Sequence, residues 1–215
     1  MELCEDIYTL INTKGELRDE AWENSFLKSL PSAKLRVLDE SPRTGPDGWP
    51  YLMVVLDASG DESASKVLTW LSDKGIGLVI NPQKESPDFV LSYGMVCNFR
   101  ERGKFLSPII NEITGQVQFS AGEKVYAGEP SEDFLPGYSR SILRTFFQGN
   151  KIEKMKVLVV SPDQKHYDLC FSLEAFGLLE EKDHNRILES IAWFLPSHYS
   201  IVLISEKNLP PFYEL

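Results

Sequence analysis

The sequence contains few residues whose types and spacing suit catalysis. Cys170 and His166 are the types from which a thiolate nucleophile and its base are built, and they lie four positions apart in a predicted strand. At the rise of a strand this spacing places them roughly 13 Å apart on one face, too far for the imidazole to activate the thiol. We therefore predict no nucleophilic cysteine.

Acidic residues offer a second kind of chemistry. Asp57, Asp61 and Glu62 lie between a predicted strand and a predicted helix and could bind a cation. Acids also gather at helix N-termini because the helix dipole favours them there, and we prefer this interpretation. The three cysteines are far apart and form no CxxC pair, and no HExxH, GxSxG, P-loop, GxGxxG or EF-hand pattern occurs. We predict no catalytic residues, no metal site and no cofactor.

A binding surface is the better candidate, and residues 92–105 suggest one. This segment combines aromatic, glycine and basic residues within an acidic protein. We interpret residues 88–106 as a hairpin in which Arg100 and Arg102 share one strand face, Phe99 occupies the other and Tyr93 lies nearby. A partner carboxylate or an acidic peptide could dock there through bidentate arginine contacts. The alternative is a hairpin whose arginines pair with the protein's own surplus acids.

The loop from Arg43 to Pro50 is a second candidate for recognition. It holds Trp49 between the turn residues Gly48 and Pro50. An exposed tryptophan is a common anchor in protein interfaces. The alternative is that Trp49 folds back onto the core.

Charge and hydropathy restrict the partners and the location. The chain has 22 basic and 32 acidic residues, so its net charge of −10 repels phosphate backbones and anionic lipid headgroups. No apolar run approaches the roughly 18 residues of a membrane helix, and acids stand where a signal peptide carries basic residues. We expect a cytoplasmic protein with a protein partner and neither nucleic acid nor membrane; a small-molecule ligand stays open.

The elements that must position these residues follow from periodicity and punctuation. Apolar stripes at helical spacing predict helices over residues 17–30, 63–74, 139–148 and 183–195. β-rich runs predict strands over residues 35–39, 51–57, 77–81, 89–93, 155–160, 167–173 and 199–205, with a less certain strand at 7–12. Each helix has one apolar stripe and must pack on something, so an α+β fold with helices on mostly antiparallel sheets is predicted.

The order of elements repeats. Residues 17–81 and 139–205 both read helix, strand, strand, helix, strand, and their residues match at offsets of 116, 120, 117 and 123 along the chain. Residues 34–42 and 154–162 are identical at five of nine positions. Trp70 aligns with Trp193, and we interpret both as core residues. We favour a duplicated domain; the alternative is that two such units share only apolar periodicity.

A family resemblance adds to this. The C-terminal part of the chain resembles the C-terminal domain of the SseB family of bacterial proteins. The resemblance lies in Leu135-Pro136-Gly137-Tyr138, in the predicted helices and strands that follow, and in the closing Pro210-Pro211-Phe212-Tyr213. The name of the family links it to enhanced serine sensitivity. The resemblance covers roughly 80 residues. It implies a bacterial cytosolic protein without a defined reaction.

These observations give one prediction of organisation and three of function. We predict two tandem related α+β domains at residues 1–115 and 136–215, joined by a linker at 116–135. The favoured function is a non-enzymatic protein-binding or regulatory protein acting through Trp49 and the segment 92–105. The alternatives are an acidic adaptor or secretion-type chaperone that holds an extended partner segment, and a small-molecule hydrolase that uses strand-end carboxylates such as Asp57 and Glu174.

Overall fold

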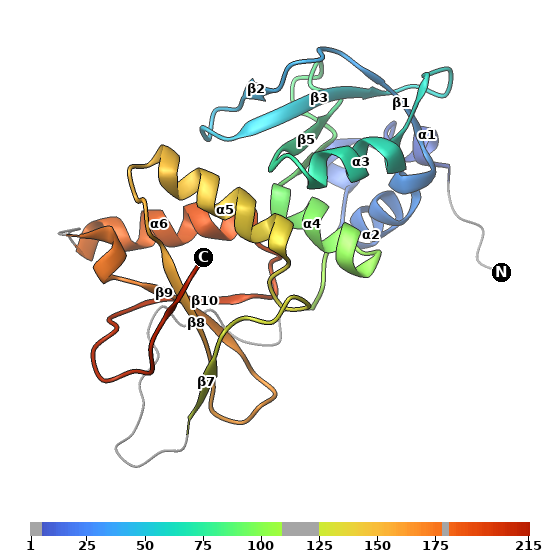
Figure 1. Ribbon diagram of the computed structural model, residues 1–215. Coiled ribbons are helices and arrows are strands. Elements are labelled where there is room, and N and C mark those ends of the chain that lie inside the picture. Colours follow the sequence, from blue (N-terminus) through green and yellow to red (C-terminus); the bar gives the residue numbers. More distant parts are fainter. Residues whose placement is uncertain (1–5, 109–124, 178–180) are drawn as a thin grey trace. The chain divides into compact units, whose positions relative to one another are not determined.

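The chain folds into two compact units, Met1–Phe105 and Leu106–Leu215. The structure is a computed structural model that describes residues 6–108, 125–177 and 181–215. Each unit is a mixed sheet with its helices on one side (Figure 1). Within the described residues no helix is long and apolar enough to cross a bilayer. The predicted α+β architecture is confirmed.

The first unit contains a six-stranded sheet. Its strand order is β4-β1-β3-β5-β6 with β2 on β3, and every pairing is antiparallel except β3 with β5. The strands are β1 (Lys34–Val37), β2 (Arg43–Thr44), β3 (Pro50–Leu56), β4 (Glu62–Ser63), β5 (Gly77–Ile80) and β6 (Phe89–Leu91). The helices are α1 (Ile7–Leu10), α2 (Glu20–Ser29), α3 (Ala64–Ser72) and α4 (Tyr93–Arg102).

The second unit contains a five-stranded sheet. Its order is β10-β9-β8-β11 with β7 also on β8, and only β9 and β10 run parallel. The strands are β7 (Tyr126–Gly128), β8 (Lys156–Ser161), β9 (Asp168–Ser172), β10 (Ser200–Ile204) and β11 (Tyr213–Glu214). The helices are α5 (Gly137–Gly149) and α6 (Glu181–Phe194), and Phe146 of α5 packs on Phe194 of α6 with ring centroids 4.9 Å apart.

The core of the first unit is an aromatic and aliphatic cluster beneath the helices. Asp19 caps α2 by accepting the Trp22 backbone N–H at 2.9 Å, which satisfies one of the free N–H groups at the start of this helix. Phe26 is fully buried and stacks on Trp22 and on Phe89, with centroid separations of 5.0 and 5.2 Å. This packing joins the N-terminal helices to the far strand β6.

The two units share one pattern of strand pairing. In the first, Val37 lies opposite Val54, and Leu52 lies opposite Leu78. In the second, Val157 lies opposite Phe171, and Leu169 lies opposite Ile201. Adding 120 to the residue numbers of β1, 117 to those of β3 and 123 to those of β5 converts the pairs of the first unit into those of the second. The repeat therefore extends to the register of all three strands.

Three predicted elements are wrong. Residues 93–102 form the helix α4 and not the arm of a hairpin, because Ser92 caps it and Tyr93, Val96 and Cys97 are buried at helical spacing. The uncertain strand at residues 7–12 is the helix α1. The described part of the predicted linker 116–135 includes β7, which pairs with β8 and so belongs to the second sheet.

Candidate functional site

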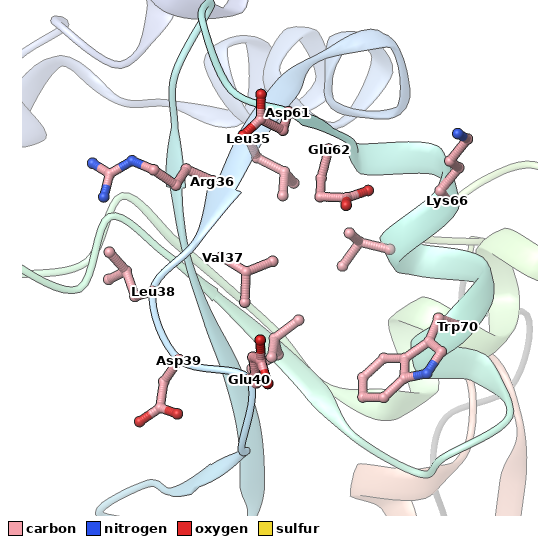
Figure 2. Close-up of a pocket in the computed structure, with 12 residues that line it drawn as sticks. Leu35, Arg36, Val37, Leu38, Asp39, Glu40, Asp61, Glu62, Lys66 and Trp70 are labelled. Atoms are coloured by element: carbon pink, nitrogen blue, oxygen red, sulfur yellow. The ribbon is translucent and has the colours of Figure 1, made fainter.

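The first unit carries a groove of about 760 Å³ between β1 and α3. Its apolar lining includes Val37 and Val67, and Trp70 stands at the α3 side. Figure 2 shows Val37, Glu62 and Trp70 directed into the space between strand and helix, whereas Arg36 and Leu38 point to the other side of β1. The volume is in the range of ligand-binding clefts, so this is the candidate site.

Trp70 is the most unusual residue of the groove. Its side chain is 44% exposed, although Val67, Leu68 and Leu71 of the same helix are buried. The Lys74 ammonium lies 6.0 Å from the ring centroid, at the outer limit of a cation–π contact. The prediction that Trp70 belongs to the core is therefore wrong. An indole left half in water beside apolar side chains is suited to a contact with another molecule.

The rim of the groove is mostly acidic. Among the residues that line it are four acidic ones, Asp39, Glu40, Asp61 and Glu62, and two basic ones, Lys66 and Arg36. The Arg36 guanidinium points to the other side of β1. Asp39 is held by the Ser41 backbone N–H and by Arg43, and these contacts lower the pKa of its carboxyl. Arg36 lies 3.6 Å from Asp57 outside the groove. Within the described residues no ion pair involves Glu40, Asp61 or Glu62. The groove therefore presents uncompensated negative charge around an apolar floor.

The edge of β1 is open along this groove. β4 pairs only with Lys34 and Leu35. A Cβ on Gly60 would lie 2.4 Å from the Leu35 carbonyl oxygen, so the loop before β4 approaches β1 closely at that point. Beyond Leu35, no strand of the described residues pairs with β1 on this side. The wall of the groove is thus unpaired backbone as well as side chains.

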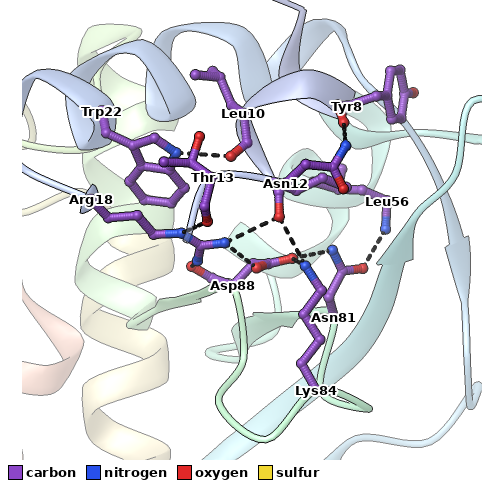
Figure 3. Close-up of polar contacts among 11 residues, drawn as sticks. Tyr8, Leu10, Asn12, Thr13, Arg18, Trp22, Leu56, Asn81, Lys84 and Asp88 are labelled. Atoms are coloured by element: carbon purple, nitrogen blue, oxygen red, sulfur yellow. Dashed lines mark hydrogen bonds and ion pairs between the residues drawn. The ribbon is translucent and has the colours of Figure 1, made fainter. Parts of the chain in front are cut away.

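A second polar cluster lies around Asp88 and is drawn in Figure 3. The Asp88 side chain is 1% exposed, and its carboxylate lies 2.6 Å from both Arg18 Nη2 and Lys84 Nζ. Asn81 donates to the same carboxylate and accepts the Leu56 backbone N–H at 2.9 Å. Burial raises the pKa of Asp88, but the hydrogen bonds from Lys84, Asn81 and Arg18 outweigh it and the pKa is lowered.

This cluster is a structural tie. The Arg18 guanidinium also donates to the carbonyl oxygens of Ile11 and Thr13, and Lys84 donates to that of Ile11. The hydrogen bonds of Arg18, Lys84 and Asp88 thus connect the N-terminal segment to the sheet, and these polar groups all have partners. Asp88 does not line the groove between β1 and α3, so we assign the cluster to stability and not to binding.

The five residues predicted from the sequence do not form one surface. Tyr93 is 1% exposed and its hydroxyl donates to the Ser72 carbonyl oxygen at 2.7 Å, so it is a core residue. Phe99 is half-buried and stacks on Phe105. The Arg100 guanidinium donates to the side chains of Asp73 and Ser72. For Arg100 the structure therefore matches the alternative interpretation, in which an arginine of this segment pairs with an acidic residue of the same protein. Arg102 is exposed, and two positions on a helix separate it from Arg100 by about 200°, so they share no face.

Trp49 lies apart from these residues, in the turn between β2 and β3. It is half-buried, and its carbonyl oxygen accepts the Gly45 N–H at 2.8 Å. A role for Trp49 in recognition stays a prediction.

The thiol and carboxyl groups that the sequence offers for catalysis have shifted pKa values. Burial, together with the nearby Asp168 carboxylate, raises the pKa of the Cys170 thiol to about 12. Hydrogen bonds from the Ser59 side chain and backbone lower the pKa of Asp57. Burial raises the pKa of Glu174, but hydrogen bonds from Ser205 and the Glu206 N–H outweigh it and lower the pKa. Within the described ranges no three His, Cys, Asp or Glu side chains are placed to hold a metal ion.

Sequence reasoning missed the groove, although one signal for it was present. At 100° per residue, Trp70 lies roughly 100° from the centre of the stripe formed by Val67, Leu68 and Leu71. It shares its side of α3 with Lys66, four positions earlier. A residue at the border of an apolar stripe beside a lysine is placed to face solvent.

Comparison of the chain with protein-family models, with curated proteins and with solved structures finds no match. The resemblance to the SseB family therefore stays a prediction.

Proposed function

We propose that this chain is a non-enzymatic protein-binding module whose groove between β1 and α3 receives a segment of a partner protein. The observation that carries the proposal is Trp70, 44% exposed across the groove from Val37. Tryptophan contributes more to protein interfaces than its frequency suggests, because it buries a large area at a low cost in side-chain entropy. The surrounding charges supply a polar rim, which is the usual anatomy of such interfaces.

The two alternatives receive less support. A chaperone that holds many extended segments needs a broad apolar surface, whereas this groove is bordered by four carboxylates. A hydrolase that used Asp57 or Glu174 as a general acid needs a raised carboxyl pKa, whereas hydrogen bonds lower the pKa of both.

Selection from a phage-displayed peptide library tests the proposal. We expect the enriched peptides to bind the wild-type chain and to lose at least about tenfold in affinity for Trp70→Ala, as for truncation of an interface anchor. Arg102→Ala is the matched control, because Arg102 is exposed on another helix. Urea unfolding shows whether Trp70→Ala still folds. Peptides that bind folded Trp70→Ala as tightly as the wild type would contradict the proposal.

A further inference from the structure

We infer that the first unit has a second binding surface, on the outer face of its sheet, which is the face turned away from the helices. This surface receives a partner segment of the pattern Glu-x-x-Leu-x-x-Phe. It is separate from the groove and does not depend on the proposed function. The equivalent face of the second sheet is covered by a segment of this pattern from its own chain.

A row of apolar side chains crosses the outer face of the first sheet. Leu38 follows β1 and bonds to Met53, Met53 lies in register with Val79, and Val79 lies opposite Val90. Neighbours in register point to the same face, and Figure 2 shows Leu38 and Arg36 on the side of β1 away from the groove. Val79 is buried and Met53 half-buried, whereas Leu38 and Val90 are 41% and 44% exposed. Both ends of the row therefore present apolar surface to water.

The second unit buries the equivalent row. The shifts of 120, 117 and 123 convert the first three residues of the row into Leu158, Cys170 and Val202. These three lie side by side in register and are at most 1% exposed. Leu209 and Phe212, from the segment that follows β10, are among the side chains that pack against them. The second unit therefore covers its outer face with its own chain.

An ion pair holds the same segment at its other end. Lys156, which corresponds to Arg36 by the shift of 120, lies 3.0 Å from the Glu206 carboxylate. The Ser172 hydroxyl donates to this carboxylate at 2.6 Å. Arg36 keeps the positive charge at this position of the first unit. Its side chain is 58% exposed and only its Nε approaches Asp57, at 3.6 Å. Because a guanidinium has five N–H donors, Arg36 can bind a further carboxylate.

The first unit directs the corresponding segment to the other side of its sheet. Phe89 corresponds to Phe212 by the shift of 123, but it stacks on Phe26 of α2 in the core beneath the helices. Lys84, in the same connection, donates to the Ile11 carbonyl oxygen in the N-terminal segment. This course of the chain leaves the apolar row of the first sheet without the cover that the second sheet has.

The covering segment of the second unit specifies the chemistry of the missing partner. Glu206 pairs with the cation of the first strand, and Leu209 and Phe212 follow three and six positions later on the apolar row. The first unit offers Arg36 and, beside it, the row that begins at Leu38. A segment with a carboxylate and two apolar side chains at this spacing complements both features. The chain's own segment of this pattern is engaged in the second unit, so we assign the surface to a segment of a different protein.

Synthetic peptides test this surface. The probe is the acetylated, amidated peptide Ser-Glu-Lys-Asn-Leu-Pro-Pro-Phe-Tyr, which has the sequence of residues 205–213. One matched peptide carries lysine in place of the glutamate, and a second carries alanine in place of both leucine and phenylalanine. Each peptide is titrated into the full chain and into Leu38→Ala, Arg36→Glu and Trp70→Ala. Urea unfolding shows that each variant is folded.

NMR of the ¹⁵N-labelled chain gives the affinities and the location. We expect the probe to bind with a Kd below about 1 mM and to shift the amide resonances of Arg36, Leu38 and Met53. Leu38→Ala, or the peptide with two alanines, should weaken binding at least about fivefold. Arg36→Glu should weaken it at least about tenfold, and the lysine peptide should restore binding to Arg36→Glu to within about threefold of the original pair. Trp70→Ala should change the Kd by less than about twofold, because the groove lies on the other side of β1.

The contrary outcomes separate this surface from the groove. No binding at about 1 mM, or equal binding by wild type, Leu38→Ala and Arg36→Glu, overturns the inference and leaves the proposed function untouched. If only Trp70→Ala weakens binding, the peptide lies in the groove, which supports the proposed function and overturns the second surface. Shifts confined to Leu158 and Cys170 would mean that the probe only replaces the chain's own segment, which also overturns it. If raising the protein concentration without peptide reproduces the shifts at Leu38, a second copy of the chain covers the face, and the assignment to a different protein is overturned.

Discussion

Val37 and Val157 occupy the same position in the two repeated sheets, but among the described residues only Val157 has a strand on its outer side. Tyr213 pairs with Val157, whereas the described residues place no strand beside Val37 beyond the end of β4. An unpaired strand edge is a site for pairing with another chain, and proteins ordinarily protect such edges. This difference is one reason why the proposed function places partner binding in the first unit.

Truncation of Phe26 tests the packing of the first unit. Phe26 is fully buried between Trp22 and Phe89, so Phe26→Ala removes contacts on both sides and leaves a cavity. We expect a loss of about 3–5 kcal/mol in the free energy of unfolding, measured by urea denaturation of the full chain. The control is Leu38→Ala, because Leu38 is 41% exposed and its loss should cost less than about 1 kcal/mol. Equal effects of the two changes would contradict the assigned core.

The Asp88 cluster predicts a pH dependence of stability. The folded pKa of Asp88 is lowered below the unfolded value of about 3.9, so its contribution is complete above that pH and is lost as the pH falls through the folded pKa. We expect Asp88→Asn to lower the free energy of unfolding of the first unit by about 2–3 kcal/mol near pH 6. This is less than the loss of a fully buried ion pair would cost, because the Lys84 side chain is 38% exposed and solvent screens its charge. The difference from wild type should shrink below about pH 4.

Unfolding by urea at a series of pH values measures this difference. Asp39→Asn is the matched control, because Asp39 also has a lowered pKa and an arginine partner but lies at the surface. We expect Asp39→Asn to leave the free energy of unfolding nearly unchanged, because exposed ion pairs contribute little to stability. A gap between wild type and Asp88→Asn that widens as the pH falls below about 4 would show that the sign is wrong.

The buried thiols should be unreactive in the folded chain. Cys97 and Cys170 are both buried, and the pKa of Cys170 is raised to about 12, so little thiolate exists at pH 8. We expect iodoacetamide to modify Cys170 at least about 100-fold more slowly in the native chain than in urea, as measured by mass spectrometry of its peptide. Rapid native alkylation of Cys170 would indicate that β9 opens readily or that the thiol is activated.

Much of the fold could be predicted from the sequence, because the repeat carries its own register. The shifts of 120 and 117 between the first two strands of each copy reproduce the pairing of Val157 with Phe171 from that of Val37 with Val54. Short strands were missed because two or three residues show no alternation, as in β7 and β11. They form only because β8 offers them an edge.

The groove itself was not predicted from the sequence, for two physical reasons. Residues 88–106 were interpreted as a hairpin, but Gly103 has a φ of +67° and ends α4 as a left-handed C-terminal glycine. Trp70 was assigned to the core because tryptophan is usually buried, although its angle on α3 places it at the border of the apolar stripe. The open edge of β1 is a property of tertiary pairing that no local pattern reveals.

Hydrogen exchange of single amides in the free protein tests the central claim that the edge of β1 is open. Val37 N–H faces the groove, whereas Leu38 N–H donates to the Met53 carbonyl oxygen. Because both amides belong to the first unit, the ratio of their exchange rates does not depend on any difference in stability between the two units. We expect the Val37 amide to exchange at least about 100-fold faster than Leu38, and Val157 to be protected to within about tenfold of Leu158. Val37 and Leu38 protected alike would mean that the edge is already covered, and would contradict the account.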